Sequence, residues 1–213
     1  MSGALRLEAA NLAISRGGIT LAGELSFALE GGSALIVTGA NGSGKSTLLR
    51  VIAGLLPASD GAITLLGGGD TYPDVAAASH YLGHQNAMKP ALSVAENLAF
   101  WQSFTGPAWQ TIETALAQTG LSHTFDTPFA WLSTGQKRRI AIAKLLLNYR
   151  PVWILDEPTA GLDAASSGSF AQMMRAHLDG GGMLVAATHV PLGLANVQTL
   201  QIGGGTHSGT AEP

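Results

Sequence analysis

The spacing of apolar residues changes along the chain, and each change separates segments of different predicted structure. From residue 4 to 30, apolar and polar positions alternate loosely, as in short antiparallel strands. Compact apolar runs predict further strands at 34–38, 63–66, 152–155, 184–188 and 198–202. Apolar residues at helical spacing predict helices at 48–56, from 93 to about 101, at 109–118, 133–147 and 170–178.

Helices dominate between about residues 87 and 149, where two capping boxes support the predicted helix starts. Ser93 pairs with Glu96, and Ser133 pairs with Gln136. In each box the hydroxyl accepts from a backbone N–H three residues on, and the longer side chain reaches back to the cap. The segment is therefore predicted to be a helical insert between two strand-rich halves.

This order predicts an α/β fold whose mixed or parallel sheet core is preceded by an antiparallel β subdomain. The chain is expected to form a single domain over residues 1–205. Its predicted parts are a core at about 1–86 and 150–205, with a helical subdomain at about 87–149. Residues 206–213 lack apolar side chains that could form a core, and we expect a flexible tail there.

The composition narrows the class of protein. Of 213 residues, 46% are hydrophobic and 12% are charged, which fits either a Gly- and Ala-rich enzyme or a subunit with an apolar patch for a partner. No apolar run approaches the roughly 20 residues of a membrane-spanning helix, and the N-terminus lacks a signal-peptide pattern. The absence of Cys excludes disulfides and Cys-type zinc sites. Eleven basic residues against fourteen acidic ones argue against a broad nucleic-acid surface.

A phosphate-binding loop is predicted between the strand at 34–38 and the helix that follows. Its glycines let the backbone N–H groups turn inward toward phosphate oxygens, and the helix N-terminus adds positive potential. Lys45 supplies a cation for the β- and γ-phosphates, and the hydroxyl of Ser46 is a ligand for Mg²⁺. The loop consists of Gly39, Ala40, Asn41, Gly42, Ser43, Gly44, Lys45, Ser46 and Thr47. ATP and Mg²⁺ are therefore the expected ligands.

Two acidic residues end the strand predicted at 152–155. Asp156 is placed to hold Mg²⁺ beside the phosphate loop, and Glu157 is placed to act as general base on the attacking water. Without the phosphate loop, both would be interpreted as surface acids before Pro158.

With these motifs in place, the chain resembles the ABC ATPases over about residues 4–202. Leu132-Ser133-Thr134-Gly135-Gln136 resembles their signature sequence, Leu-Ser-Gly-Gly-Gln. The resemblance implies a nucleotide-dependent head-to-tail homodimer, in which the signature of one subunit contacts the γ-phosphate bound by the other. Ser133, Gly135 and Gln136 would then be nucleotide contacts, although Ser133 could also serve only as a helix cap.

Three further positions match this family in order. The resemblance implies that Gln85 contacts Mg²⁺ and the attacking water, that Asp163 lies at the dimer seam, and that His189 contacts the γ-phosphate. Each of these residues taken alone would be an ordinary polar residue.

Two positions depart from the family pattern. Thr134 replaces a glycine of the signature, and a β-branched residue restricts the backbone there, so either the contact tolerates it or activity is reduced. Arg16 stands where the family has an aromatic residue against adenine. Its guanidinium could stack on the purine or lie free on the surface, which leaves base selectivity open.

Several stretches resemble one subgroup, the haem-exporter ATP-binding subunits of cytochrome c maturation. These are 82–85 with Lys89-Pro90, 95–100, 136–139, 153–158 and 188–192. The resemblance implies a peripheral subunit on the cytoplasmic face of a bacterial inner membrane, with integral transporter subunits as partners. Whether haem itself is moved or a haem-chaperone complex is released stays open. No direct haem binding is expected, because the chain lacks a Cys-x-x-Cys-His motif.

Three alternatives are consistent with parts of the sequence. The first is the ATP-binding subunit of another exporter, for lipid, metal or peptide. The second is an ABC ATPase acting on nucleic acid or ribosomes, which the single cassette and the absence of Cys disfavour. The third is a regulatory nucleotide binder without turnover, against which Lys45, Asp156, Glu157 and His189 argue.

Overall fold

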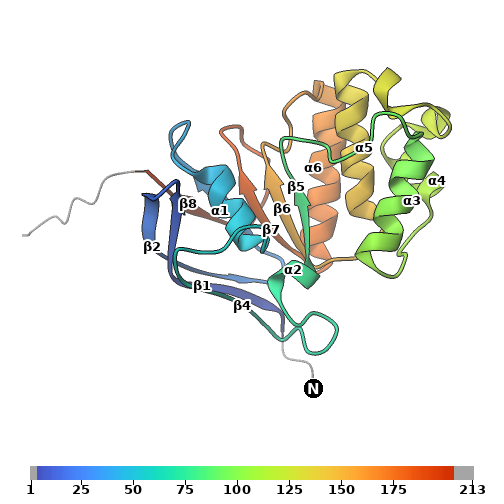
Figure 1. Cartoon of the computed structure of the whole chain (residues 1–213). Helices are drawn as coiled ribbons and strands as arrows, with labels where there is room; N and C mark the ends of the chain where they lie inside the picture. The colour runs from blue at the N-terminus through green and yellow to red at the C-terminus, as the bar shows by residue number, and fades with distance from the viewer. Residues whose placement is uncertain (1–3, 204–213) are drawn as a thin grey trace, which may run out of the picture.

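The computed structural model describes residues 4–203, and the tail predicted at 206–213 lies outside this part of the chain. Two β-sheets and a group of helices make up the fold (Figure 1). The first sheet is antiparallel, in the order β2-β1-β4, and the second is parallel, in the order β5-β6-β7-β3-β8. This arrangement confirms the predicted α/β fold, with its antiparallel part at the N-terminal end.

Three strands come first in the chain, and helices then separate the strands from β3 to β7. The strands are β1 (Arg6–Arg16), β2 (Ile19–Glu30), β3 (Ala34–Thr38), β4 (Asp60–Leu66), β5 (Ser79–Leu82), β6 (Val152–Asp156), β7 (Met183–Ala187) and β8 (Val197–Gln201). The helices are α1 (Lys45–Ile52), α2 (Val75–Ala78), α3 (Val94–Thr105), α4 (Ile112–Gln118), α5 (Thr134–Leu146) and α6 (Ala164–Asp179), with 3-10 turns at Ser122–Thr124 and Phe129–Trp131.

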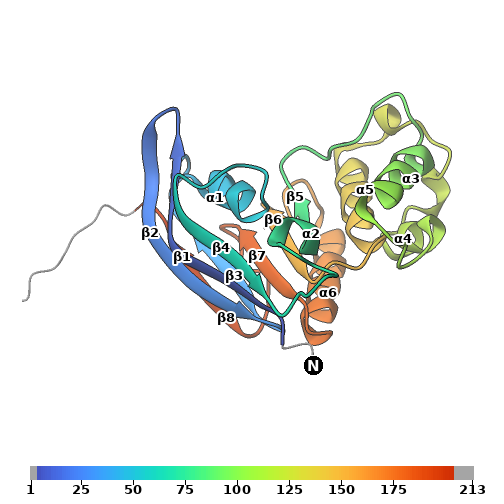
Figure 2. The same cartoon turned by 60° about the horizontal axis from the view of Figure 1, so that its bottom comes forward.

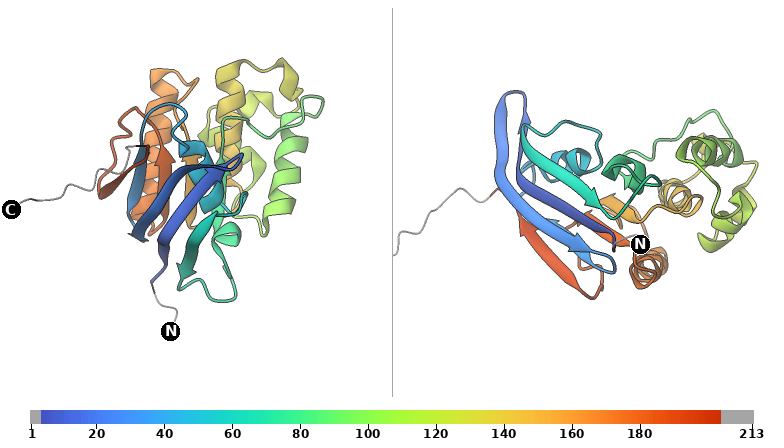
Figure 3. Two further views of the ribbon diagram at one scale, coloured as in Figure 1. Left: turned by 60° about the vertical axis from the view of Figure 1, so that its left-hand side comes forward. Right: turned by 90° about the horizontal axis from the view of Figure 1, so that it is seen from below.

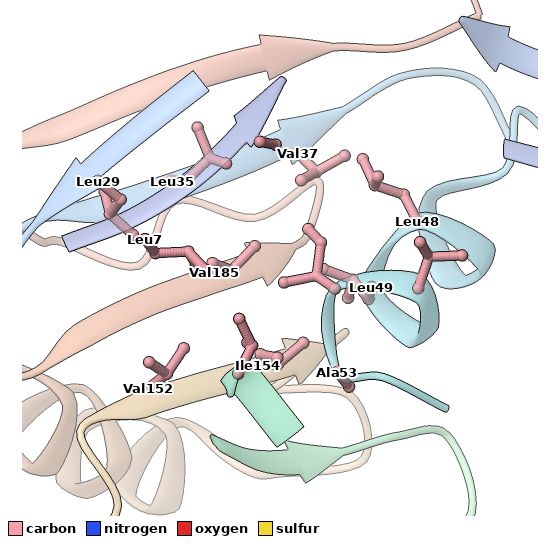
Figure 4. Packing of buried hydrophobic residues seen from close by; sticks show 14 of the residues in the cluster. Leu7, Leu29, Leu35, Val37, Leu48, Leu49, Ala53, Val152, Ile154 and Val185 are labelled. Atoms are coloured by element: carbon pink, nitrogen blue, oxygen red, sulfur yellow. The ribbon is translucent and has the colours of Figure 1, made fainter. Parts of the chain in front are cut away.

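Side chains alternate between the two faces of the central strands, so each strand contributes to two cores. In β6, Val152 and Ile154 join the cluster shared with α1 and the antiparallel sheet (Figure 4). Trp153 and Leu155 point the other way and pack with α6, where Phe170 is fully buried. The parallel sheet is thus covered on both faces.

A third core lies within residues 94–147, where α3, α4 and α5 pack on one another. In Figures 2 and 3, α3 and α4 lie to one side of the sheets, and α5 lies between them and the parallel sheet, against which it also packs. Both predicted capping boxes are present: Ser93 accepts from Glu96 N at 3.1 Å, and Ser133 accepts from Gln136 N at 3.2 Å.

The structure contains two elements that the sequence pattern did not predict. β5 has four residues and α2 has four, which is too short for either to show a clear period. β5 is held instead by parallel pairing with β6, from Ser79 with Val152 to Leu82 with Leu155. Helix α6 begins at Ala164 rather than 170, because Asp163 caps it by accepting from Ser166 N at 2.7 Å.

A buried polar cluster joins the end of α5 to the core. Asn148 donates to the carbonyl groups of Gln102, Gly106 and Pro107 at 3.2, 2.7 and 2.8 Å. Its own carbonyl group lies 2.8 Å from Nε2 of His80. Burial lowers the pKa of His80 from 6.5 to about 3.

His80 makes the stability of the fold depend on pH. Its pKa is lower in the folded state, so between pH 6.5 and about 3 the unfolded chain binds more protons and stability falls as pH falls. This one group should reduce the free energy of unfolding by about 2 kcal/mol at pH 5. We expect His80→Gln, which does not titrate and whose amide can donate to Asn148, to show a shallower loss between pH 7.5 and 5.

Chemical denaturation at the two pH values measures this effect. The free energy of unfolding of the variant should still depend somewhat on pH, since burial also lowers the pKa of His177 to about 4. An equal loss of stability in both proteins would show that His80 does not carry the effect.

Candidate nucleotide site

The loop between β3 and α1 is arranged around its lysine. Nζ of Lys45 donates to the carbonyl groups of Gly39 and Ala40 at 2.7 and 2.9 Å. Gly44 has a φ of 100° and precedes the first turn of α1, a backbone conformation that glycine adopts without strain. The following N–H groups of α1 therefore face the hollow of the loop, as an anion site requires.

This hollow belongs to a cavity of about 540 Å³. The cavity is lined by six residues of the predicted loop, Asn41, Gly42, Gly44, Lys45, Ser46 and Thr47, whereas Gly39, Ala40 and Ser43 do not line it. The rest of its wall consists of Arg16, Ile19, Leu21, His84, Asp156 and Glu157.

Arg16, Ile19 and Leu21 come from the β1–β2 hairpin. The structure thus places Arg16 at the cavity, together with an aliphatic surface that the sequence analysis did not include. Ile19 is 69% exposed, although an isoleucine in a strand is usually covered. The position of Ile19 at the cavity could not be predicted from sequence, because the β1–β2 hairpin and α1 come together only in the folded chain.

Asp156 and Glu157 stand at the end of β6, next to the loop. Asp156 is 2% exposed, and its Oδ2 is buried without a hydrogen-bond partner. Glu157 has a φ of 46°, which is uncommon for a residue other than glycine and costs about 1–3 kcal/mol. Its N–H donates to the carbonyl group of Ala187 at 2.9 Å, so β7 helps to hold this conformation.

The carboxylate of Glu157 contacts His189, which was predicted to contact the γ-phosphate. Oε1 of Glu157 lies 3.1 Å from Nδ1 of His189, which follows β7. The histidine side chain is 81% exposed and that of Glu157 is 20% exposed. Parallel pairing of β6 with β7 brings these two strand ends together, with Asp156 beside Ala187.

The signature segment does not face this cavity. Ser133 and Gln136 form the capping box of α5, and neither they nor Gly135 line the cavity. Ser133 is exposed at the N-terminus of the helix. In its own chain, Ser133 therefore acts as a helix cap and leaves the same helix end accessible from outside.

Thr134 is accommodated without backbone strain. It is the first residue of α5 and has no positive φ, so the concern raised by its branched side chain does not apply to the helix. Gly135 is the constrained position: a Cβ there would lie 3.3 Å from the carbonyl oxygen of Gly161, in the loop before α6. The glycine permits this close approach of the two segments.

We expect Gly135→Val to reduce the free energy of unfolding by about 1–3 kcal/mol, because the added methyl groups press on the Gly161 carbonyl. Gly168→Val is the matched control, since it makes the same change in α6 where a Cβ would meet no atom within 4 Å. Chemical denaturation of both variants checks the prediction. Equal changes in the two proteins would contradict a close approach at Gly135.

Three further predicted positions, Gln85, Asp163 and His189, lie outside the cavity wall, and His189 lines a separate pocket next to β7 instead. Gln85 is exposed and does not line the cavity, whereas its neighbour His84 does. Asp163 is exposed, and the hydrogen bond from the Ser166 N–H lowers its pKa. His84 had no predicted role, since a single histidine beside a strand carries no specific signal.

Comparison with known proteins agrees with this geometry. The family model described as ABC transporter matches residues 22–160. This segment contains the phosphate loop, the signature and both acids at the end of β6. It covers more than half of the chain.

Whole-chain relatives identify the subgroup. A cytochrome c biogenesis ATP-binding export protein CcmA from Chelativorans sp. (strain BNC1) is 57% identical over 201 residues, which cover 94% of this chain and all of that protein. The chain belongs to the CcmA family of ABC transporter ATP-binding proteins. Proteins of the same name from Mesorhizobium japonicum and Brucella abortus (strain 2308) are 58% and 59% identical, over 91% and 89% of this chain and 96% and 88% of theirs.

Solved structures have the same fold. The chain is similar to cbiO1 from Clostridium perfringens, part of the ABC transporter complex cbiONQ, with a TM-score of 0.72, 28% identity and coverage of 92% of this chain and 86% of that one. A putative ABC transporter ATP-binding protein from Pyrococcus furiosus has a TM-score of 0.77 at 22% identity, covering 92% and 97%. Membership of the family implies that the chain binds a nucleotide.

Proposed function

We propose that this protein hydrolyses ATP as the ATP-binding subunit of an export complex that serves cytochrome c biogenesis, with haem or a haem-chaperone complex as the cargo. The observation that carries ATP hydrolysis is the contact of Glu157 with His189 at the end of β6, beside the phosphate loop. The assignment to cytochrome c biogenesis rests on relatives that are 57–59% identical over nearly the whole chain.

Asp156 and Ser46 are proposed to hold Mg²⁺ together with phosphate oxygens. The buried Oδ2 of Asp156 lacks a partner, and a carboxylate in that state suits a hard cation. Within residues 4–203, no group of three or more acidic or histidine side chains could hold a metal alone. This fits a Mg²⁺ ion that takes its remaining ligands from ATP and water, and the bound ion would neutralise charge on the phosphates.

Glu157 is proposed to accept the proton of the attacking water, and His189 to orient the γ-phosphate and the carboxylate. The 3.1 Å contact between them holds the carboxylate at the mouth of the cavity. Lys45 would neutralise the β- and γ-phosphates on the other side. Gln85 would have to move toward the cavity to contact Mg²⁺ and the water, since it is now exposed outside the wall.

The adenine base is proposed to lie against the β1–β2 hairpin. There Arg16 offers a guanidinium plane, and Ile19 and Leu21 offer aliphatic surface. Aliphatic contact and a planar cation discriminate weakly between purines, because neither reads the hydrogen-bonding edge of the base.

A head-to-tail homodimer is proposed for the ATP-bound state. At the N-terminal end of α5, Ser133 is exposed in its own chain and Gly135 and Gln136 are partly exposed, and these residues would serve the nucleotide of the partner. The N-terminus of a helix favours an anion there. Asp163, which caps α6 close to this helix end, would lie at the seam.

Integral membrane subunits are proposed as the other partners, which places the protein at the cytoplasmic face of the inner membrane. No helix among residues 4–203 is long and apolar enough to cross a membrane. Helix α3 exposes Phe100 and Phe104 by 49% and 70%, and their rings stack with centroids 6.0 Å apart. This aromatic pair suits contact with an apolar segment of a membrane subunit.

Deletion of the gene tests the physiological assignment. The absorbance of c-type cytochromes should disappear from membranes of the deletion strain and return when the wild-type gene is supplied. A gene encoding Lys45→Ala should fail to restore it while producing protein at the normal level. Normal cytochrome absorbance in the deletion strain would instead point to another exporter, and nucleic-acid binding by the purified protein at physiological salt would point to a different class.

A further inference from the structure

Arg138 is a buried arginine whose hydrogen bonds join three separate segments of the chain. It lies on α5, five residues after the cap Ser133, and is 5% exposed. Its Nη1 donates to the carbonyl group of Gly83 at 2.7 Å, and its Nη2 donates to those of Asp156 and Glu157 at 3.1 and 2.8 Å. All three acceptors lie at the ends of two neighbouring parallel strands, β5 and β6.

The three carbonyl groups explain why an arginine can be buried at this position. Strand ends leave carbonyl groups without ladder partners, and a planar guanidinium can donate to several of them at once. Burial lowers the pKa of Arg138, and the charge of Asp156 counteracts part of this shift. A lysine would place one point charge here and could not match the same fork of donors.

The segments held by Arg138 are the ones that carry the proposed chemistry. Gly83 lies two residues before Gln85, while Asp156 and Glu157 are the proposed metal ligand and base. Glu157 also has the strained φ of 46°, so its carbonyl direction is set by the groups that bind it. Arg138 is therefore one of the few contacts that maintain the backbone from which the Glu157 side chain projects.

A small cavity lies directly beside this contact. Its volume is about 90 Å³, and it is lined by Arg138, Glu157, His84, Asn86, Thr134 and Ala160. Two buried polar atoms have no partner, Nε of Arg138 and Oδ1 of Asn86. A space of this size and polarity suits ordered water.

We propose that Arg138 is a positioning residue that couples the placement of helix α5 to the catalytic base of the same chain. This inference rests on the proposed function, in which the N-terminus of α5 serves the nucleotide of the partner. One helix then makes both contacts. Ser133 faces the nucleotide site of the partner subunit, and Arg138 binds the backbone at Gly83 and Glu157 of its own subunit. Docking of α5 on the partner's nucleotide thereby sets the position of the base.

Arg138→Ala in the complete transporter complex tests the proposal. We expect kcat for ATP to fall by about 10²-fold, the loss typical of a displaced catalytic group. The dissociation constant for ATP should stay within about threefold, since Lys45 and Ser46 are unaffected. ATP-driven pairing, measured in a Glu157→Gln background, should also persist. Arg138→Lys should give an intermediate kcat, because one ammonium group can replace only some of the hydrogen bonds that the guanidinium donates.

Lys137→Ala is the matched control, since it removes a cation from the preceding position of α5, where Nζ donates to the carbonyl of Ala130 at 3.0 Å and lies over the ring of Phe129, away from both strand ends. A kcat for Arg138→Ala equal to that of Lys137→Ala would overturn the proposal. So would a parallel loss of kcat, ATP affinity and pairing, which would indicate a general structural role. If Glu157→Gln itself retained turnover, Glu157 would not be the base and the premise taken from the proposed function would have failed. Loss of turnover in Glu157→Gln but not in Arg138→Ala would reject only the role of Arg138.

Discussion

Glu157→Gln is expected to lower phosphate release by about 10²–10⁴-fold and to leave ATP binding intact. Glutamine keeps the size and reach of the side chain but cannot accept the proton of the attacking water. The phosphate loop is unaffected, because Lys45 holds it through Gly39 and Ala40 independently of β6. Binding should therefore remain within a few-fold of the wild type.

Two assays separate these effects. Phosphate release is measured in the complete transporter complex, and affinity is measured with a fluorescent ATP analogue. Glu113→Gln is the matched control, since it makes the same change in the first turn of α4, outside the cavity wall. Undiminished phosphate release from Glu157→Gln would reject Glu157 as the base and would leave His189 as the remaining candidate.

Ser133→Arg is expected to abolish ATP-driven pairing of subunits. The exposed N-terminus of α5 is proposed to approach the γ-phosphate of the partner, and a long side chain at the cap would occupy that space. The experiment is done in a Glu157→Gln background so that ATP persists, and light scattering reports the mass of the complex. Pairing should fall to the level seen without ATP.

Loss of the helix cap must be separated from the added bulk. Ser133 accepts from Gln136 N at 3.2 Å, and losing such a cap costs about 1 kcal/mol. Ser133→Ala removes the cap without adding bulk, so it should reduce stability by that amount and retain much of the pairing. Normal pairing by Ser133→Arg would mean that Ser133 serves only as a cap, and the head-to-tail arrangement would lose its support.

Local sequence was enough to predict the elements that carry short-range signals. The phosphate loop is one continuous segment, so its glycines, Lys45 and Ser46 are recognisable without tertiary information. Both capping boxes span four residues and were found at Ser93 and Ser133 as expected. Uninterrupted apolar runs such as 152–155 predicted buried strands, because a strand covered on both faces requires apolar residues throughout.

Other features depend on contacts between segments that are distant in sequence, so only the structure revealed them. β5 was missed because four residues show no clear period, and its pairing with β6 joins positions about seventy residues apart. His84 and Ile19 reach the cavity from separate parts of the chain. The concern about Thr134 also changed, since the close approach lies at Gly135 instead.

By itself the sequence determined the family, the phosphate loop and the chemical types of the groups around the nucleotide, because each depends on residues near one another in the chain. The tertiary structure decided which of these groups touch. It joined Glu157 to His189 through the pairing of β6 with β7, and it placed Arg138 under the carbonyl groups of two strand ends. Such contacts depend on strand order and register, which the packing of the whole core sets and no local pattern encodes.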